Sequence, residues 1–231
     1  MRLDKLVAHL GYGSRKQVKQ FIRKGNVSVN GEIIRDDDFH VNELEDEIVI
    51  LDDVIDYQAF QYFLLNKPKE TICSHDRSLY LSVLDLIQEN VLPHTQPVGR
   101  LDVDTTGIIL ITNDGQCAHR LLSPKHHVEK VYEVTLKNPF NKKYIKDIEQ
   151  GLKLNEHEVC LPAQVTLIDD THLLLTLKEG KYHQVKRMML MCQNEVIELH
   201  RKQFAFLTCG ELICGEYRVL TESEIKTLKA Y

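Results

Sequence analysis

Apolar residues recur at two spacings along the chain. In residues 3–10 and 15–24 they fall three or four positions apart, the spacing of one face of a helix. Ser14 is a favourable residue to precede the second helix. Asn30-Gly31, between two short apolar runs, is a strong signal for a tight hairpin turn. The first part is therefore predicted to contain helices over 3–10 and 15–24, a hairpin with strands at 27–29 and 32–34, and a strand over 47–51.

From Phe60 onward, short alternating runs typical of strands are mixed with helical patterns. Strands are predicted over 60–65, 108–112, 128–137, 159–168, 173–177 and 196–200. Helices are predicted over 82–88, 116–122, 141–150 and 182–193, and after Thr221. No regular strand–helix–strand rhythm is present, so the predicted class is α+β with a largely antiparallel sheet. The change of pattern predicts two domains, residues 1–58 and 59–231.

The net charge of −5 is unevenly distributed. Residues 1–31 hold seven Lys and Arg against one Asp, whereas residues 32–59 hold eleven Asp and Glu against one Arg. A phosphate backbone responds to the local face and not to the total charge. The acidic run from Asp36 to Asp56 is predicted to be a solvated turn and linker that repels RNA. The cations expected to bind RNA are Arg2, Arg15, Lys16, Lys19, Arg23 and Lys24, with a plain solvated helix face as the alternative.

Cysteine and histidine do not form a ligand pattern. None of the six cysteines belongs to a C-x-x-C pair, and no cysteine–histidine cluster has zinc-finger spacing. We therefore expect buried thiols, no metal and no cofactor. No apolar stretch approaches the roughly 18–20 residues that span a bilayer, and no signal-type apolar core follows the N-terminus. A cytoplasmic protein that does not enter a membrane is expected.

The loop over residues 99–107 carries the clearest chemistry. It contains Arg100, Asp102, Asp104, Thr105 and Thr106 between two glycines, directly before an apolar run. Loop ends beside strands hold side chains in place while leaving them accessible. Local physics does not rank the two carboxylates. The two threonines are expected to cap or hydrogen-bond the loop and not to touch the substrate.

Three segments together resemble the RsuA/Rlu group of pseudouridine synthases in order and spacing. They are Gly99-Arg100-Leu101-Asp102-Val103-Asp104-Thr105-Thr106-Gly107, Glu129-Lys130-Val131-Tyr132-Glu133-Val134, and Glu179-Gly180-Lys181-Tyr182-His183-Gln184-Val185-Lys186-Arg187-Met188. The first 50 residues resemble the S4 RNA-binding domain. The resemblance implies an S4-like domain joined to a pseudouridine synthase domain.

The resemblance also implies an activity: isomerisation of one uridine of 16S ribosomal RNA, at uridine 516, by a cytoplasmic and monomeric enzyme. It implies Asp102 as the essential aspartate, acting by attack on C1′ or by removal of the 2′ proton. Tyr132 would stack on the target base. Lys186 is the cation expected to face Asp102, with Arg187 as the alternative, because adjacent residues on a helix point about 100° apart.

The nucleotide must leave the RNA stack to be reached. Arg100 is a candidate to fill the gap or hold phosphate, with a loop salt bridge to Asp102 or Asp104 as its alternative. His183 and Gln184 are expected to line the pocket, and Arg187 to contact RNA. Three other functions remain open: a synthase acting on 23S ribosomal RNA, a non-catalytic S4-type ribosome-assembly protein, and a carboxylate-dependent hydrolase.

Overall fold

The computed structural model describes residues 1–43, 45–55 and 57–231. The chain divides into two compact units: Met1–Gln61 with Asn90–Thr95, and Tyr62–Glu89 with Gln96–Tyr231. The domain division between residues 58 and 59 stays a prediction, because compactness alone does not show that a segment folds by itself. Of the predicted acidic linker, Asp56 lies outside the described residues. No helix in the described ranges is long and apolar enough to cross a membrane.

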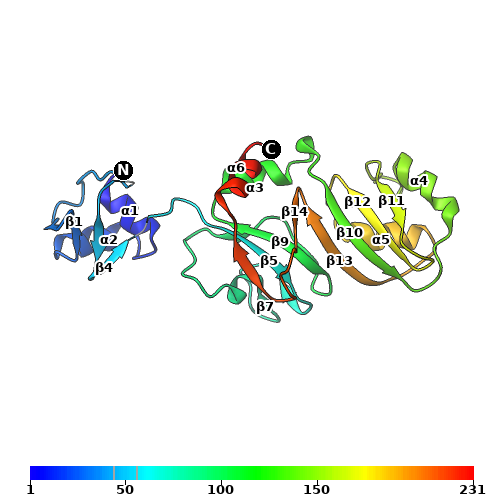
Figure 1. Ribbon diagram of the computed structural model, residues 1–231, viewed down its shortest axis with the longest axis horizontal. Helices are drawn as coiled ribbons and strands as arrows, with labels where there is room; N and C mark the ends of the chain where they lie inside the picture. Colours follow the sequence, from blue (N-terminus) through cyan, green and yellow to red (C-terminus); the bar gives the residue numbers. More distant parts are fainter. Residues whose placement is uncertain (44, 56) are drawn as a thin grey trace. The chain divides into compact units, whose positions relative to one another are not determined.

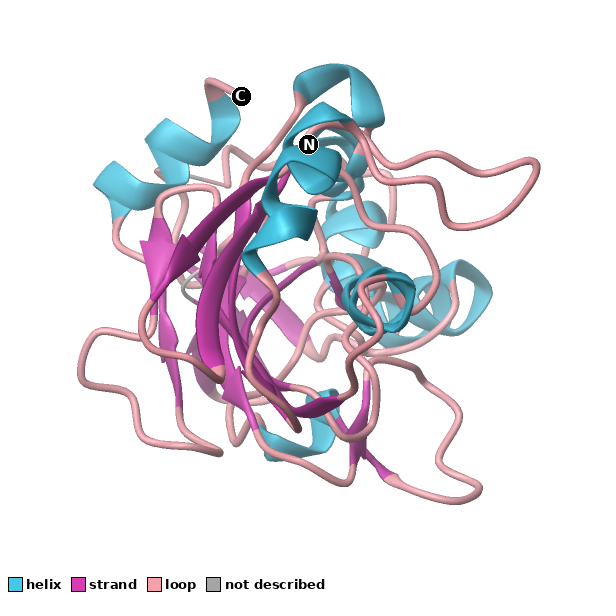
Figure 2. Ribbon diagram, turned by 90° about the vertical axis from the view of Figure 1, so that its right-hand side faces the viewer, coloured by secondary structure: helices cyan, strands magenta, loops and turns pink. Residues whose placement is uncertain are grey.

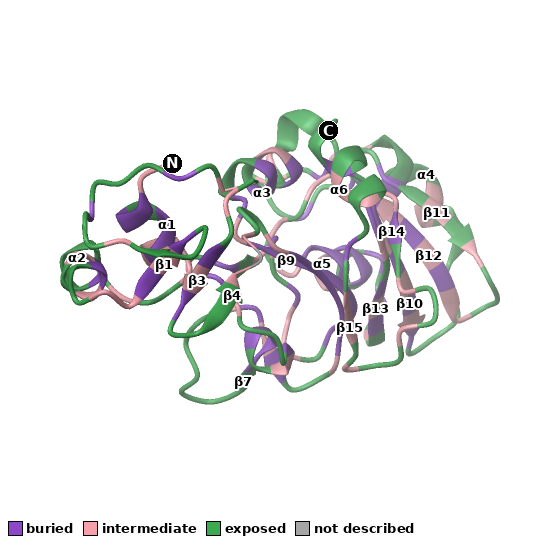
Figure 3. Cartoon of the chain, turned by 60° about the vertical axis from the view of Figure 1, so that its left-hand side comes forward, coloured by how far each residue is buried: buried purple, intermediate pink, exposed green. Residues whose placement is uncertain are grey.

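The first unit pairs two helices with a small antiparallel sheet of order β2-β1-β3-β4. Its elements are α1 (Leu3–His9), α2 (Arg15–Arg23), β1 (Val27–Val29), β2 (Glu32–Ile33), β3 (Ile48–Ile50) and β4 (Asp53–Ile55). The predicted hairpin is confirmed, with Asn30 and Gly31 both at positive φ. The apolar faces of both helices and of the sheet form one core, and buried residues are visible along α1 and β1 in Figure 3.

The second unit contains a large sheet of order β11-β12-β10-β13-β9-β5-β15 (Figure 1). Its strands are β5 (Tyr62–Lys67), β6 (Thr71–Ile72), β7 (Leu81–Ser82), β8 (Gln96–Pro97), β9 (Thr106–Thr112), β10 (Lys130–Leu136), β11 (Gln164–Leu167), β12 (His172–Leu177), β13 (Val196–Phe204), β14 (Leu207–Thr208) and β15 (Tyr217–Val219). Its helices are η1 (Val83–Leu86), α3 (Gly115–Leu122), η2 (Pro124–His126), η3 (Lys142–Tyr144), α4 (Ile145–Gln150), α5 (Gln184–Met191) and α6 (Glu222–Lys229).

The large sheet is mixed but largely antiparallel, which confirms the predicted α+β class. Its neighbours run antiparallel except β9 and β13, which are parallel. Figure 2 shows its strands as a curved, twisted surface, which is the normal form of such sheets. The helices α3 and α6 pack against β5 and β9 in one apolar cluster. Asp114 supports this packing, because it accepts hydrogen bonds from the Tyr62 hydroxyl (2.6 Å) and from the N–H of Cys117 at the start of α3 (2.9 Å).

Several predicted boundaries were wrong. The strand β5 begins at Tyr62 and continues through Lys67, and all six of its residues are buried. The predicted helix over 82–88 is a 3-10 turn. The helix α5 begins at Gln184 because His183 has left-handed backbone (φ 46°) and cannot continue a helix toward Tyr182. The strands β4, β6, β7, β8, β14 and β15 were not predicted, since short strands carry little periodicity.

Candidate active site

Buried groups from outside the 99–107 loop hold it in place. The ammonium of Lys67 donates to the carbonyls of Thr105 (2.9 Å) and Pro68 (3.0 Å). The N–H of Leu101 donates to the thiol of Cys73 (3.4 Å). Burial lowers the pKa of Lys67 and raises the pKa of Cys73. The loop that carries Asp102 is therefore anchored on β5 and on the segment after it.

The end of the loop is fixed by the close approach of β9 to β13. A Cβ atom on Gly107 would lie 2.3 Å from the carbonyl oxygen of Arg201, so only glycine fits there. Beside it, the hydroxyl of Thr106 lies 2.8 Å from Nδ1 of His200 on β13. Thr106 forms a structural hydrogen bond, as expected, but this bond joins the end of the loop to the neighbouring strand β13.

Thr105 differs from the prediction. Its backbone N–H donates to the carbonyl of Asp102 (3.1 Å), which tightens the loop. Its side-chain hydroxyl, however, is buried without a hydrogen-bond partner in the part of the chain that the structure describes. The loop is therefore held by backbone groups, Lys67 and Cys73, and the hydroxyl of Thr105 adds no hydrogen bond.

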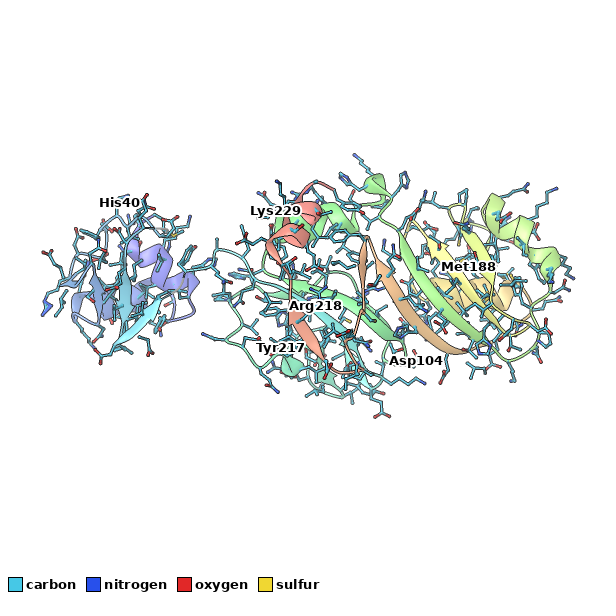
Figure 4. The ribbon with its side chains drawn as sticks, in the orientation of Figure 1. His40, Asp104, Met188, Tyr217, Arg218 and Lys229 are labelled. Carbon is cyan, nitrogen blue, oxygen red and sulfur yellow. The ribbon has the colours of Figure 1, made fainter. Side chains whose placement is uncertain are left out.

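Asp102 lies beside a lysine and a histidine of the third motif. Its carboxylate is 3.0 Å from the ammonium of Lys186 and 3.5 Å from Nε2 of His183. Lys186 also contacts Asp104 at 2.6 Å. Burial acts to lower the pKa of Lys186, but the hydrogen bonds that its ammonium donates to Asp104 and Asp102 outweigh burial and leave that pKa raised. Figure 4 labels Asp104, two residues before β9, and Met188 on α5, the helix that supplies Lys186.

The two basic candidates of the third motif point to different partners. Lys186 faces Asp102, whereas Arg187 forms an ion pair with Glu158 and donates to the carbonyl oxygen of Tyr182 at 3.2 Å. The sequence left this choice open. Adjacent side chains on a helix point in different directions, and the sequence does not tell which of them faces the loop.

Two cavities meet at Asp102. The narrow pocket has a volume of about 80 Å³ and is lined among others by Asp102, Thr105, Tyr132, Leu177, Lys186 and Leu199. The wide groove has a volume of about 1090 Å³ and is lined among others by Ser74, His75, Pro97, Arg100, Lys181 and Tyr182. Tyr132, which is 8% exposed, forms part of the pocket wall from β10. The site therefore combines a carboxylate, a cation and an aromatic ring with an open approach.

The remaining predicted pocket residues take different positions. Arg100 is exposed and lines both cavities, and it forms no ion pair with Asp102, Asp104 or any other described residue. His183 also lines both. Gln184 reaches the pocket wall, but its amide accepts from the N–H of Lys181 (2.9 Å) and donates to Glu179 (2.8 Å), so it braces the preceding loop.

The predicted basic ridge of the first unit is partly neutralised. Lys19 and Arg23 contact Asp37 at 2.8 Å and 2.7 Å, and Arg2 forms an ion pair with Asp38. The hydrogen bond from Lys19 is the main cause that lowers the pKa of Asp37 to about 2. The prediction of a solvated linker was therefore wrong at Asp37, which is buried.

Three predicted cations keep their charge available. Arg15, Lys16 and Lys24 are exposed and have no ion-pair partner among the residues described.

The carboxylates of Asp4, Asp37 and Asp38 lie within 4.8 Å of one another. A metal ion could use such a cluster, but Arg2 and Lys19 already contact it.

Sequence reasoning did not single out two residues of this site, Lys67 and Tyr182. Lysine is rarely buried, so composition and periodicity give no reason to expect a buried ammonium at Lys67. Tyr182 was treated as part of a helix, and its place in the wide groove depends on the left-handed turn at His183. No local signal in the sequence identifies either role.

Comparisons with known proteins identify the family of this chain. Residues 61–191 match the RNA pseudouridylate synthase family, and residues 1–48 match the S4 domain. The chain is 42% identical over 231 residues to ribosomal small subunit pseudouridine synthase A of Haemophilus influenzae, covering 99% of both chains. It is 40% identical over 230 residues to the protein of that name from Escherichia coli, covering 99% of this chain and 100% of that protein.

A solved structure gives the same result. A crystal structure of a pseudouridylate synthase is 40% identical, covers 99% of both chains and superposes with a TM-score of 0.69. The match extends over the S4 segment and over all three motifs around the pocket. This chain therefore belongs to the family of RNA pseudouridylate synthases and carries an S4 domain at its N-terminus.

Proposed function

We propose that this protein converts one uridine of small-subunit ribosomal RNA, uridine 516 of 16S RNA, to pseudouridine, with Asp102 as the catalytic residue. The observation that carries the proposal is the 3.0 Å contact between Asp102 and Lys186 in a pocket walled by Tyr132. The full-length relatives named as small-subunit synthases support the choice of RNA.

The reaction breaks the bond between ribose C1′ and uracil N1 and joins C1′ to C5 of the same base. N1 gains a proton and C5 loses one, so the reaction is an isomerisation without oxidation or reduction. Asp102 can attack C1′ and form an ester, or remove the 2′ proton and form a glycal. Deuterium at C2′ separates these roles: a primary isotope effect supports the glycal route, and its absence supports direct attack.

The neighbouring residues serve this carboxylate and the base. Lys186 supplies an opposite charge 3.0 Å from this carboxylate. The ring of Tyr132 offers a face for the flipped uracil. Arg100 offers an exposed cation for phosphate, and Arg15 and Lys16 of the S4 domain offer further cations for the RNA backbone.

The test compares wild type with Asp102→Asn on unmodified 16S RNA, both naked and in partly assembled subunits. We expect wild type to form pseudouridine at one position, Asp102→Asn to form none, and both to bind RNA. Asp104→Asn is the matched control, because Asp104 shares Lys186 but does not line the narrow pocket. It is expected to form product.

Each other outcome selects a different function. Product from Asp102→Asn would remove Asp102 as the catalyst. Product only on 23S RNA would reassign the substrate. Tight RNA binding without product on any RNA would favour a ribosome-assembly protein that uses the S4 domain alone.

A further inference from the structure

Tyr182 is a large aromatic residue placed in solvent beside the site. It is 73% exposed, although it lies two residues before α5 and next to the active-site loop. One face of its ring stacks on His183, with centroids 3.9 Å apart and planes 15° apart. The high exposure leaves its opposite face open.

The stacked pair lies where the two cavities join. His183 lines both the narrow pocket and the wide groove, and its Nε2 is 3.5 Å from Asp102. Tyr182 lines the wide groove but not the narrow pocket. A group stacked on the open face of Tyr182 would therefore lie in the groove, outside the place of the target base.

The surrounding loop holds this arrangement. Arg187, anchored by its ion pair with Glu158, donates to the carbonyl of Tyr182 at 3.2 Å. The left-handed backbone of His183 brings the two rings together. Left-handed backbone is uncommon in residues other than glycine. The ring is thus set in position by contacts that do not involve the substrate.

We infer that Tyr182 binds an RNA base adjacent to the flipped uridine, as a stacking platform in the wide groove. The inference rests on the proposed function and adds a second nucleotide subsite to it. An exposed ring with one open face fits a nucleobase, and the groove also presents Arg100, an exposed cation without an ion-pair partner among the described residues. A nucleotide can stack its base on the ring of Tyr182 while its phosphate contacts the guanidinium of Arg100.

This subsite defines a feature of the substrate. Stacking accepts any base, because every base has an aromatic face, but the base must be unpaired. The enzyme should therefore require an unpaired nucleotide on one side of the target uridine without reading its identity. Replacing that nucleotide by an abasic one should weaken binding roughly 5- to 150-fold.

The experiment uses the full-length Asp102→Asn protein, so that the RNA stays unreacted, and an RNA on which the modified uridine has been mapped. 2-Aminopurine is placed on one side of that uridine or on the other, because stacking quenches its fluorescence. Quenching at one of the two positions is expected with Tyr182 and with Tyr182→Phe. It should be lost in Tyr182→Ala. Tyr231→Ala, which removes an exposed tyrosine outside both cavities, is the matched control and should keep it.

Turnover with Asp102 intact then separates stacking from a structural effect. Wild type should lose affinity on the abasic RNA, whereas Tyr182→Ala should bind natural and abasic RNA equally weakly. KM should rise in Tyr182→Ala with kcat nearly unchanged. Quenching that persists in Tyr182→Ala, or an equal abasic loss in both proteins, would overturn the subsite and leave the proposed function standing. Absence of product with wild type would remove the function and the subsite together.

Discussion

Two buried lysines of the second unit, Lys67 and Lys130, lack a carboxylate at ion-pairing distance within the described ranges. Lys67 is 0% exposed, and its ammonium donates hydrogen bonds to the carbonyls of Thr105 and Pro68. Lys130 is 8% exposed, donates to the carbonyl of Val128 and lies over the ring of Phe204. A buried charge without a counter-ion is costly, so each must be compensated by the backbone groups it binds.

Lys67→Met should loosen the loop that carries Asp102. The variant keeps the apolar stem but leaves the buried carbonyl of Thr105 without its donor, which costs about 1–3 kcal/mol of unfolding free energy. We expect lower stability in urea unfolding and a lower kcat. Lys69→Met is the control, since Lys69 is half-exposed and should change stability by less than about 0.5 kcal/mol. Equal or greater stability of Lys67→Met would show that the loop does not depend on Lys67.

Lys130 should make stability depend on pH. Burial, followed by the charge of Arg201, lowers its pKa to about 8. The unfolded chain holds this proton up to about pH 10.4, so between these values the unfolded state binds more protons and stability rises with pH. Relative to Lys130→Met, wild type should gain about 2 kcal/mol between about pH 7.5 and 9.5 in urea unfolding. A constant difference between the two proteins would contradict the lowered pKa.

At the scale of elements, the parallel contact between β9 and β13 fixes the site. His200 and Arg201 of β13 pair with Thr106 and Gly107 of β9. This register places the loop before β9 next to β10, which carries Tyr132 opposite Arg201. The carboxylate and the aromatic ring meet because three strands distant in sequence are neighbours in the sheet.

Gly107→Ala should break this contact. Its Cβ would lie 2.3 Å from backbone, and its φ of 109° is unfavourable for alanine. We expect a loss of about 2–4 kcal/mol in unfolding free energy together with loss of activity. Gly115→Ala is the matched control, because no atom lies within 4 Å of its Cβ position and alanine favours helix α3. Wild-type stability of Gly107→Ala would mean that the two strands can separate without cost.

At the scale of the whole molecule, charge pairing decides which cations are available to RNA. The net charge of −5 includes a basic N-terminal segment. Within this segment some cations are paired with carboxylates and others are not. Lys19 and Arg23 contact Asp37, whereas Arg15, Lys16 and Lys24 have no such partner among the described residues. Only unpaired cations release counterions fully when they bind phosphate.

Lys16→Gln and Arg23→Gln should therefore differ. Each removes one positive charge from α2, but Arg23 is already offset by Asp37. In RNA binding measured across salt concentrations, Lys16→Gln should reduce the slope of log affinity against log salt by about 1. Arg23→Gln should reduce it by less than half as much. Equal slopes in the two variants would show that Asp37 does not screen Arg23.

Much of this protein was determined by sequence alone. Periodicity and turn residues placed the helices of the first unit, the hairpin at Asn30-Gly31 and most long elements of the second unit, because these signals are local. The three motifs identified the family, which the comparisons confirm. They also marked Asp102, whose catalytic role stays a prediction.

The tertiary structure decided the rest. Only the orientation of α5 in the folded protein brings Lys186, and not Arg187, to Asp102. Only folding places Lys67 where its ammonium binds the carbonyl of Thr105 in the loop. Asp37 became a partner of Lys19 because folding returned the acidic run to α2. Such contacts join residues far apart in the chain, and their energies depend on distance and burial, which a sequence does not contain.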